Sequence, residues 1–175
     1  MQISAQEEAD PVRFRRAMAT FATGVAVVTT AWRGRSYGMT LNSLTSVSLD
    51  PCLLLFCSTR GSATGKAVRD RGAFVINILG SEQHEMCRRF VGRFAKRFEG
   101  LEPVMSATGL PMLAGALGHI CCQVYAVHPG GDHDVIIGRV ESCAEAPGRP
   151  LVFHRGGYGT FMPDNLSSGA QGSVQ

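Results

Sequence analysis

The sequence predicts a mostly β protein, an antiparallel β-barrel with helices at its periphery. Several segments rich in β-branched and aromatic residues follow one another at hairpin spacing. The strand-helix-strand alternation that marks a parallel sheet does not run through the chain. The run CLLLFC, residues 52–57, is apolar at every position, which is typical of a strand covered on both faces. A barrel or a sandwich accommodates such a strand better than an open meander does, and the number of strands at hairpin spacing favours a closed barrel.

The composition indicates one domain that associates with further copies of itself. The chain has 175 residues, of which 45% are apolar and only 18% charged. This length fits a single domain with a real core, and the small charged share leaves apolar surface for another subunit. We expect one domain over residues 11–162, flexible ends at 1–10 and 163–175, and a homo-oligomer.

Charge and hydropathy argue against nucleic-acid and membrane partners. The formal net charge is +3 and no block of lysine or arginine dominates, so the electrostatic footprint of a nucleic-acid binder is missing. The start MQISAQEEAD lacks the apolar core of a signal peptide, and no apolar run approaches the ~20 residues that span a bilayer. The six cysteines contain no C-x-x-C pair. We expect a cytoplasmic protein with reduced core thiols and no metal site.

The first third of the chain predicts a helix and a hairpin. Asp10 and Pro11 form a side-chain cap followed by proline at the first helical position. Apolar residues from Phe14 to Phe21 then recur on one face, and Gly24 can close the helix. The strand-like segments GVAVVTTAW (24–32) and SYGMTL (36–41) flank a turn at 33–35.

The remaining segments add further strands and two short helices. LTSVSLD (44–50) alternates as a strand and ends at Asp50-Pro51, before the apolar run. STRGSATGKAVRD (58–70) is a loop that enters a helix, AFVINIL (73–79) is a strand, and SEQHEMCRRF (81–90) is a serine-capped helix. The stretch 91–117 has no clear period. Three more strands are expected in HICCQVYAVHP (119–129), DVIIGRVESCA (134–144) and PLVFHRGGYGTF (150–161).

The loop from Gly61 to Lys66 is a candidate phosphate site. It is not a P-loop, because three residues separate its glycines and Ala67 follows the lysine. Ser62, Thr64 and the free backbone N–H groups of a helix start could still hold a phosphate. A capped helix start in a surface loop explains the same residues.

Two other polar stretches could bind a planar ligand. TLNSLTSVSLDP (40–51) keeps strand alternation while lining one side with hydroxyl and amide groups, which suit the polar edge of a flat heterocycle or simply an exposed face. RRFVGRFAKRFEG (88–100) mixes five basic residues with three phenylalanines. It could clamp an anion beside an aromatic ring, bind single-stranded nucleic acid, or be a solvated helix end with Phe90 and Phe94 packed inward.

Two histidine-bearing segments complete the candidates. His133 follows two glycines and Asp132 in GGDHDVIIGRV (130–140), and a neighbouring carboxylate can fix a histidine's tautomer and proton affinity. A structural histidine at a strand start is the alternative. HRGGY (154–158) offers a histidine, a cation and a tyrosine around a glycine turn. Without Gly-x-Ser-x-Gly or His-Glu-x-x-His, hydrolase and metallopeptidase mechanisms are set aside.

In this order the segments resemble the short-chain flavin reductase family, the reductase halves of two-component flavin monooxygenases. The resemblance spans Phe14 to Phe161 and is carried by FRRAMATFATGVAVVTT, GMTLNSLTSVSLDPCLLLFC, STRGSAT, FAKRFEG, the GDH triplet at 131–133 and HRGGYGTF. The chain differs from the family pattern at Cys52, where a second proline is common, and at Leu44, where an aromatic residue is frequent.

The resemblance implies an FMN-binding split β-barrel, antiparallel with Greek-key connections, that forms a homodimer. The implied enzyme is an NAD(P)H:flavin oxidoreductase that reduces FMN or FAD by direct hydride transfer, with NADH or NADPH as co-substrate. Reduced flavin would then pass by diffusion to a partner flavin-dependent monooxygenase. Two alternatives stay open: an oxidase like pyridoxamine-phosphate oxidase that keeps its FMN, and a non-enzymatic sensor that binds flavin or haem.

The resemblance also implies roles for individual residues. The isoalloxazine and ribityl groups would meet Thr40, Asn42, Ser43 and the nearby Ser48. The flavin phosphate would be held by Ser58, Ser62 and Thr64. The residues that would close over the flavin or its nucleotide tail are Phe90, Lys96, Arg97 and Phe98. His133 would steady the nicotinamide as the catalytic residue, with its ring fixed by Asp132, and the nicotinamide side would be completed by Arg155 and Tyr158.

Overall fold

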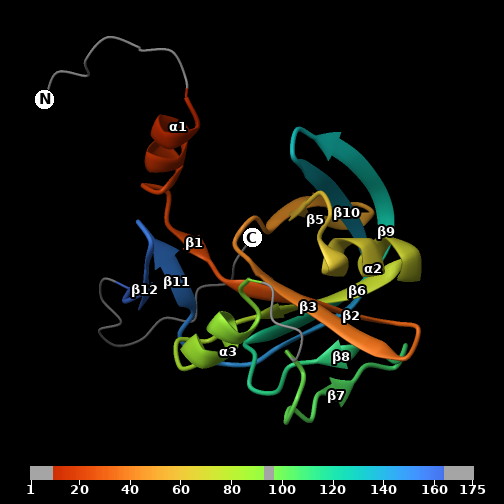
Figure 1. Ribbon diagram of the computed structural model, residues 1–175. Helices are drawn as coiled ribbons and strands as arrows, with labels where there is room; N and C mark the ends of the chain where they lie inside the picture. The colour runs from red at the N-terminus through yellow and green to blue at the C-terminus, as the bar shows by residue number, and fades with distance from the viewer. Residues whose placement is uncertain (1–9, 93–96, 164–175) are drawn as a thin grey trace, which may run out of the picture.

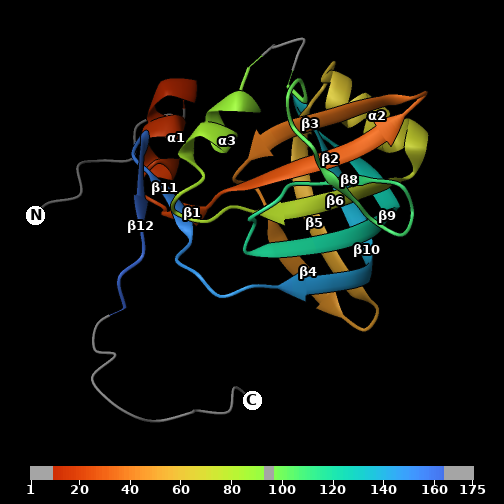
Figure 2. The same cartoon turned by 90° about the horizontal axis from the view of Figure 1, so that it is seen from below.

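The computed structural model describes residues 10–92 and 97–163. Its main feature is a curved seven-stranded sheet in the order β3-β2-β6-β9-β10-β5-β4, with every neighbouring pair antiparallel (Figures 1 and 2). The strands are β2 (Ala26–Trp32), β3 (Arg35–Leu41), β4 (Thr45–Leu49), β5 (Cys52–Thr59), β6 (Ala73–Ile78), β9 (Gly118–Gly130) and β10 (His133–Glu145). The predicted class, mostly β with peripheral helices, is confirmed.

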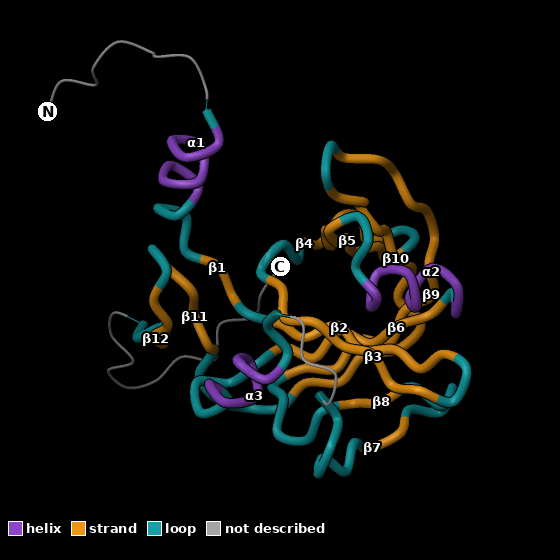
Figure 3. The backbone as a smooth tube through the Cα atoms, in the orientation of Figure 1, coloured by secondary structure: helices purple, strands orange, loops and turns teal. Residues whose placement is uncertain are grey.

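The described residues also form two smaller sheets and three short helices. In Figure 3 one of the small sheets and the first helix lie together to one side of the main sheet. One small sheet has the order β1-β11-β12, and the other is the hairpin of β7 and β8. Their bounds are β1 (Thr23–Gly24), β7 (Val104–Met105), β8 (Pro111–Met112), β11 (Leu151–His154) and β12 (Gly157–Thr160). The helices are α1 (Pro11–Met18), α2 (Ala63–Arg71) and α3 (His84–Arg89). None of the described helices is long and apolar enough to cross a membrane.

The main core lies inside the curve of the sheet and is covered by α2. Val68 of α2 is fully buried in one cluster with Val28, Phe56, Phe74 and Ile136, which come from four different strands. Phe56 and Phe74 meet edge-on with ring centroids 5.1 Å apart. This packing fixes α2, and with it the loop that precedes the helix, against β2 and β3.

The predicted helix starts are partly right. Asp10 caps α1 by accepting hydrogen bonds from the backbone N–H groups of Val12 and Arg13, at 2.8 and 3.1 Å. The helix ends at Met18 and not at Gly24, because the carbonyl of Ala19 accepts a hydrogen bond from the N–H of Arg155 and the chain then enters β1. Ser81 does not cap α3, which begins after Gln83 with no side-chain cap.

Strand β5 is buried on only one face, whereas the sequence predicted burial on both faces. Leu54, Phe56 and Ser58 are buried, whereas Leu53, Leu55 and Cys57 are only half-buried on the opposite face. Within the monomer, therefore, an apolar strip of β5 remains partly open.

The cysteines also differ in how far they are buried. All six are free; Cys87 and Cys122 are buried, Cys57 and Cys121 are half-buried, and Cys52 and Cys143 are exposed. The expectation of core thiols therefore holds for two of them. Among the described residues, no group of three or more histidine, cysteine or acidic side chains is placed to hold a metal ion.

Candidate active site

A cavity of about 700 Å³ lies where the end of β3 meets the start of α2 and the segment after α3. Hydroxyl groups, one aromatic ring and two arginines surround it. The described residues that line the cavity are Met39, Thr40, Thr59, Arg60, Gly61, Ser62, Ala63, Thr64, Phe90, Val91, Gly92 and Arg97. Five of the residues predicted from the sequence therefore share one space: Thr40, Ser62, Thr64, Phe90 and Arg97.

The start of α2 forms one wall of this cavity. Ser62 is the N-cap, and its hydroxyl accepts a hydrogen bond from the N–H of Gly65 at 3.2 Å. Gly65 is needed here for close approach, because a Cβ at this position would stand 2.2 Å from the hydroxyl of Ser58 on β5. The helix therefore sits directly on β5, with its first backbone N–H groups beside the cavity.

All three predicted phosphate-binding hydroxyls have a hydrogen-bond partner within the protein, and that of Ser62 donates to the sulfur of Met39 at 3.5 Å. Thr64 is buried and donates to the carbonyl of Gly38 at 3.0 Å. Ser58 is also buried, and its hydroxyl lies beneath α2, 3.9 Å from the sulfur of Met39. Of the three, Ser62 is the one that is half-exposed at the cavity. The phosphate role of all three stays a prediction.

Strand β3 fixes the wall formed by α3. The hydroxyl of Thr40 donates to the carbonyl of Cys87 at 2.7 Å, and the N–H of Thr40 donates to the carbonyl of Phe90 at 3.1 Å. Phe90 packs against Gly38, where a Cβ would lie 2.6 Å from the ring, and meets Phe98 edge-on at 5.1 Å. Phe98 thus supports the ring of Phe90 from behind instead of lining the cavity.

Arg97, which follows the undescribed residues 93–96 in the sequence, lines the same wall. Its guanidinium donates to the carbonyl of Gly38, and its Nε is buried without a hydrogen-bond partner among the described residues. Burial lowers the pKa of Arg97 from its usual value. Lys96, predicted beside it, lies outside the described residues.

The turn between β9 and β10 brings His133 to the rim. Gly131 takes a left-handed conformation, φ +66°, which an L side chain rarely adopts. The Nδ1 of His133 lies 2.7 Å from Oδ1 of the exposed Asp132, and its Nε2 lies 3.3 Å from the hydroxyl of Thr59, a cavity residue. The hydrogen bond from His133 holds the pKa of Asp132 below its usual range. Each ring nitrogen of His133 therefore has a polar partner, and together the two partners fix the orientation of the ring.

Asn42 and Tyr158 line a smaller neighbouring cavity of about 120 Å³, which Thr40 also borders. Tyr158 packs against Phe153 and His84, with ring centroids 5.2 and 5.6 Å apart. A hydrogen bond with Cys87, together with burial, raises the pKa of Tyr158 to about 12.

Three other predicted residues make local bonds away from both cavities. Ser43 accepts a hydrogen bond from the N–H of Cys57 on β5 at 3.0 Å. Ser48 accepts one from the N–H of Asp50 at 3.2 Å in the turn after β4. Arg155 occupies the left-handed turn between β11 and β12, where its N–H holds the carbonyl of Ala19. Their proposed ligand contacts stay predictions.

Sequence reasoning missed several cavity residues, among them Met39, Thr59, Arg60 and Val91. Thr59 and Arg60 lie within the STRGSAT segment that carries the resemblance, so the motif was the available signal. Met39 and Val91 carry no chemical signal, since an apolar residue at a strand or helix end is ordinary.

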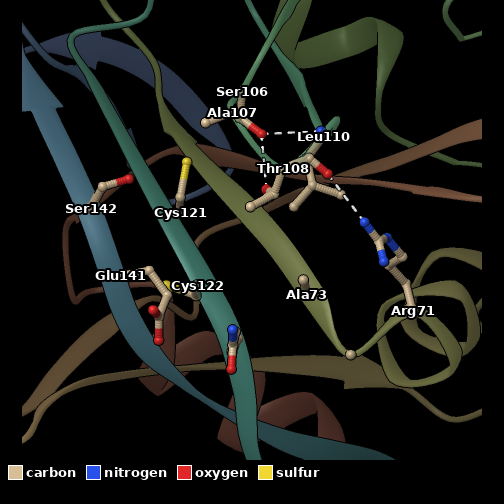
Figure 4. A pocket seen from close by; sticks show the side chains of 12 residues that line it. Arg71, Ala73, Ser106, Ala107, Thr108, Leu110, Cys121, Cys122, Glu141 and Ser142 are labelled. Atoms are coloured by element: carbon tan, nitrogen blue, oxygen red, sulfur yellow. Dashed lines mark hydrogen bonds between the residues drawn. The ribbon is translucent and has the colours of Figure 1, made fainter.

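A separate cavity of about 360 Å³ lies between β9, β10 and the hairpin of β7 and β8 (Figure 4). Arg71 closes one side by donating to the carbonyl of Thr108 at 3.1 Å. Burial is the main cause that raises the pKa of Cys122 to about 12, so this thiol stays protonated. None of the described lining residues is among those predicted from the sequence.

Comparison with known proteins gives consistent matches along most of the chain. A family model described as "Flavin reductase like domain" matches residues 18–162. The reductase subunit HsaB of a flavin-dependent monooxygenase from Rhodococcus jostii is 42% identical over 161 residues, covering 91% of this chain and 83% of that protein. An NADH-dependent flavin reductase from Rhodococcus is 38% identical, covering 86% of each. The crystal structure of a homologue of nitrilotriacetate monooxygenase component B from Mycobacterium thermoresistibile superposes with a TM-score of 0.84 at 39% identity, covering 93% of this chain and 92% of that one.

Proposed function

Because the chain belongs to the flavin reductase-like domain family, we propose that the cavity of about 700 Å³ beside β3 and the start of α2 is where FMN or FAD is reduced by NADH or NADPH. The enzyme is an NAD(P)H-dependent flavin reductase, and two of its relatives are named NADH-dependent flavin reductase and FMN reductase (NADH). The observation that carries the choice of cavity is the convergence of Thr40, Ser62 and Phe90 around one space, with His133 held at its rim.

The residues present fit a flavin nucleotide. A cavity of about 700 Å³ falls within the ~300–1,000 Å³ of typical ligand sites. Phe90 offers an aromatic edge, and the start of α2 offers backbone N–H groups for an anion. Arg97 also lines the cavity, and its buried Nε has no hydrogen-bond partner among the described residues. No acidic side chain is among the described residues that line the cavity.

A bound flavin would supply the ring that accepts hydride from the nicotinamide. The chain's own residues bind and orient the two reactants. Thr40 and Phe90 fix the wall along β3, Ser62 and the start of α2 meet the polar end, and His133 positions the nicotinamide at the rim. No side chain is required as a general base, because hydride transfer itself releases no proton to the protein.

Purified protein tests this function directly. We expect it to oxidise NADH or NADPH when FMN, FAD or riboflavin is added, followed at 340 nm under anaerobic and aerobic conditions. Failure with all three flavins and both nicotinamides would defeat the reductase proposal. Flavin that stays bound through gel filtration and turns over without a nicotinamide would favour an oxidase instead.

We further propose that the protein works as a homodimer and that a separate flavin-dependent monooxygenase uses the reduced flavin. The support for the dimer is the half-buried strip on β5 together with the matching side chains of β10. Val135 pairs with Cys57 and Ile137 with Leu55, and paired residues share one face of a sheet. The support for the oxygenase is the naming of relatives as reductase subunits. Diffusion of reduced flavin between the two proteins is part of the proposal.

We also propose a cytoplasmic location. The support is chemical: Cys52 and Cys143 are exposed free thiols, and exposed thiols persist best in a reducing compartment.

A further inference from the structure

The cavity is lined by two arginines in addition to the hydroxyl groups predicted to bind a phosphate. Among the described lining residues, Arg60 and Arg97 are the only charged side chains. Arg97 is bonded to the carbonyl of Gly38, and the hydroxyl of Thr64 is bonded to that same carbonyl. Arg60 is therefore the cation best placed to meet an anionic ligand.

The guanidinium of Arg60 is held in place from one side only. Its Nε donates to Oδ1 of Asp134 at 3.3 Å, and among the described residues its two Nη nitrogens donate no hydrogen bond. The backbone is held as well, because the N–H of Arg60 donates to the carbonyl of Asp132 at 2.9 Å. Half of the side chain is exposed, so the free N–H groups remain open to a ligand.

Asp134 is the partner that directs this arginine. Its carboxylate is only 17% exposed and is shared, with Oδ2 lying 2.5 Å from Nη1 of Arg69 on α2. Arg69 thus fixes the carboxylate, and the carboxylate fixes Arg60. A guanidinium bonded through one edge keeps a second edge with parallel donors, the geometry that suits phosphate oxygens.

We propose that Arg60 is the phosphate-binding cation of this cavity and that Asp134 is the positioning residue that aims it. The inference rests on the proposed function, because the phosphate then belongs to a flavin or a nicotinamide nucleotide. Arg60 stands between Ser62 at the start of α2 and Thr59, the partner of His133, so either nucleotide could present its phosphate there.

Matched ligands with and without phosphate test the proposal. Dissociation constants are measured by flavin fluorescence for FMN and riboflavin, and kcat/KM is measured for reduced nicotinamide riboside, its mononucleotide and NADH. The variants are Arg60→Met, which keeps the length of the apolar stem, Arg60→Lys and Asp134→Asn. Asp70→Asn is the control, because Asp70 lies on α2 next to Arg69, pairs with Lys66 at 2.6 Å and does not line the cavity.

Arg60→Met is expected to reduce the preference for the phosphorylated ligand about tenfold, either among the flavins or among the nicotinamide compounds. Arg60→Lys is expected to restore part of this preference. A loss in the flavin series assigns the flavin phosphate, and a loss in the nicotinamide series assigns the nucleotide reductant. Raised ionic strength should narrow the wild-type preference in the same series.

Asp134→Asn separates positioning from bulk charge. Removing a carboxylate near the site should strengthen phosphate binding if only net charge matters, whereas a positioning role predicts a loss of about two- to fivefold. Asp70→Asn should leave the preference unchanged.

The proposal has clear contrary outcomes. An Arg60→Met variant that keeps both preferences, or that loses riboflavin binding to the same degree as FMN, overturns the role of Arg60. An Asp134→Asn variant with an unchanged or increased preference overturns the role of Asp134. A wild-type protein that prefers FMN to riboflavin but never oxidises NADH would instead defeat the reductase proposal and leave the phosphate site standing.

Discussion

At the scale of single residues, the site depends on close packing against two glycines and on the orientation of the His133 ring. Gly38 lets the ring of Phe90 reach β3, and Gly65 lets α2 rest on Ser58. His133 is oriented by Asp132 on one side and by Thr59 on the other. The sequence motifs singled out Ser62 and His133, which the structure places at the cavity and at its rim, and their ligand contacts stay predictions. They could not show that Thr64 bonds to a carbonyl 26 positions away, because no local pattern carries that information.

His133→Ala is expected to raise KM for NADH or slow flavin reduction severalfold while leaving flavin affinity nearly unchanged, since His133 stands at the rim and not among the lining residues. Stopped-flow reduction and a flavin titration separate the two effects. His128→Ala is the control, because His128 is exposed on β9 and lines none of the cavities described above. An unchanged reduction rate and an unchanged KM would remove His133 from the mechanism.

Gly38→Ala is expected to lower the free energy of unfolding by about 1–3 kcal/mol and to raise KM for the flavin. The added Cβ would stand 2.6 Å from the ring of Phe90, so the ring and the cavity wall must shift. Chemical denaturation and flavin titration measure the two effects. Gly159→Ala should change neither, because nothing lies within 4 Å of a Cβ at that position; equal effects in both variants would contradict the close-packing explanation.

At the scale of elements, strands were more predictable than helix ends. Alternating β-branched residues located the hairpin of β2 and β3, whose turn at Arg33 and Gly34 has positive φ at both positions. The predicted C-terminal end of α1 and the predicted cap of α3 were wrong, because such ends are decided by tertiary hydrogen bonds such as that from Arg155 to Ala19. The position of α3 likewise depends on contacts with β3 and β12, and these come from distant parts of the chain.

Tyr158→Phe tests how α3 is held. Loss of the phenol hydroxyl, whose interaction with the Cys87 thiol raises its pKa, is expected to lower the free energy of unfolding by about 0.5–1 kcal/mol near neutral pH. The folded-state pKa of Tyr158 is raised to about 12, so the contribution of the protonated phenol is complete below about pH 10 and is lost as the pH rises toward 12. Urea denaturation from pH 7 to 11 measures it. Tyr125→Phe, at an exposed tyrosine of β9, should show no such loss. Equal pH dependence of the free energy of unfolding in the two variants would contradict a stabilising role of the Tyr158 hydroxyl.

At the scale of the whole molecule, composition anticipated surface that a monomer does not cover. No residue of α1 is buried, and Phe14 is 64% exposed. The strip on β5 and β10 is only half-buried. The run CLLLFC was expected to be covered on both faces, and within the monomer its second face is only partly covered, which supports the proposed dimer.

Ile137→Glu is expected to shift the protein from dimer to monomer, because a carboxylate on this strip would have to be buried without a partner. Sedimentation velocity across a concentration series measures the change, and circular dichroism checks that the fold is kept. Ser36→Glu, at the exposed tip of the β2–β3 hairpin, is the control. A monomeric wild-type protein, or a folded Ile137→Glu variant that stays dimeric, would contradict the proposed interface.

The pairing of β5 with β10 has a consequence for synthesis on the ribosome. Thr59 and His133, which meet at the cavity rim, are 74 positions apart in the chain. At translation speeds of about 5–20 residues per second, the start of β10 is synthesised roughly 4 to 15 s after the end of β5. During that interval the apolar residues of β5 form an unpaired strand edge, the state in which nascent chains are most prone to aggregate and to need a chaperone.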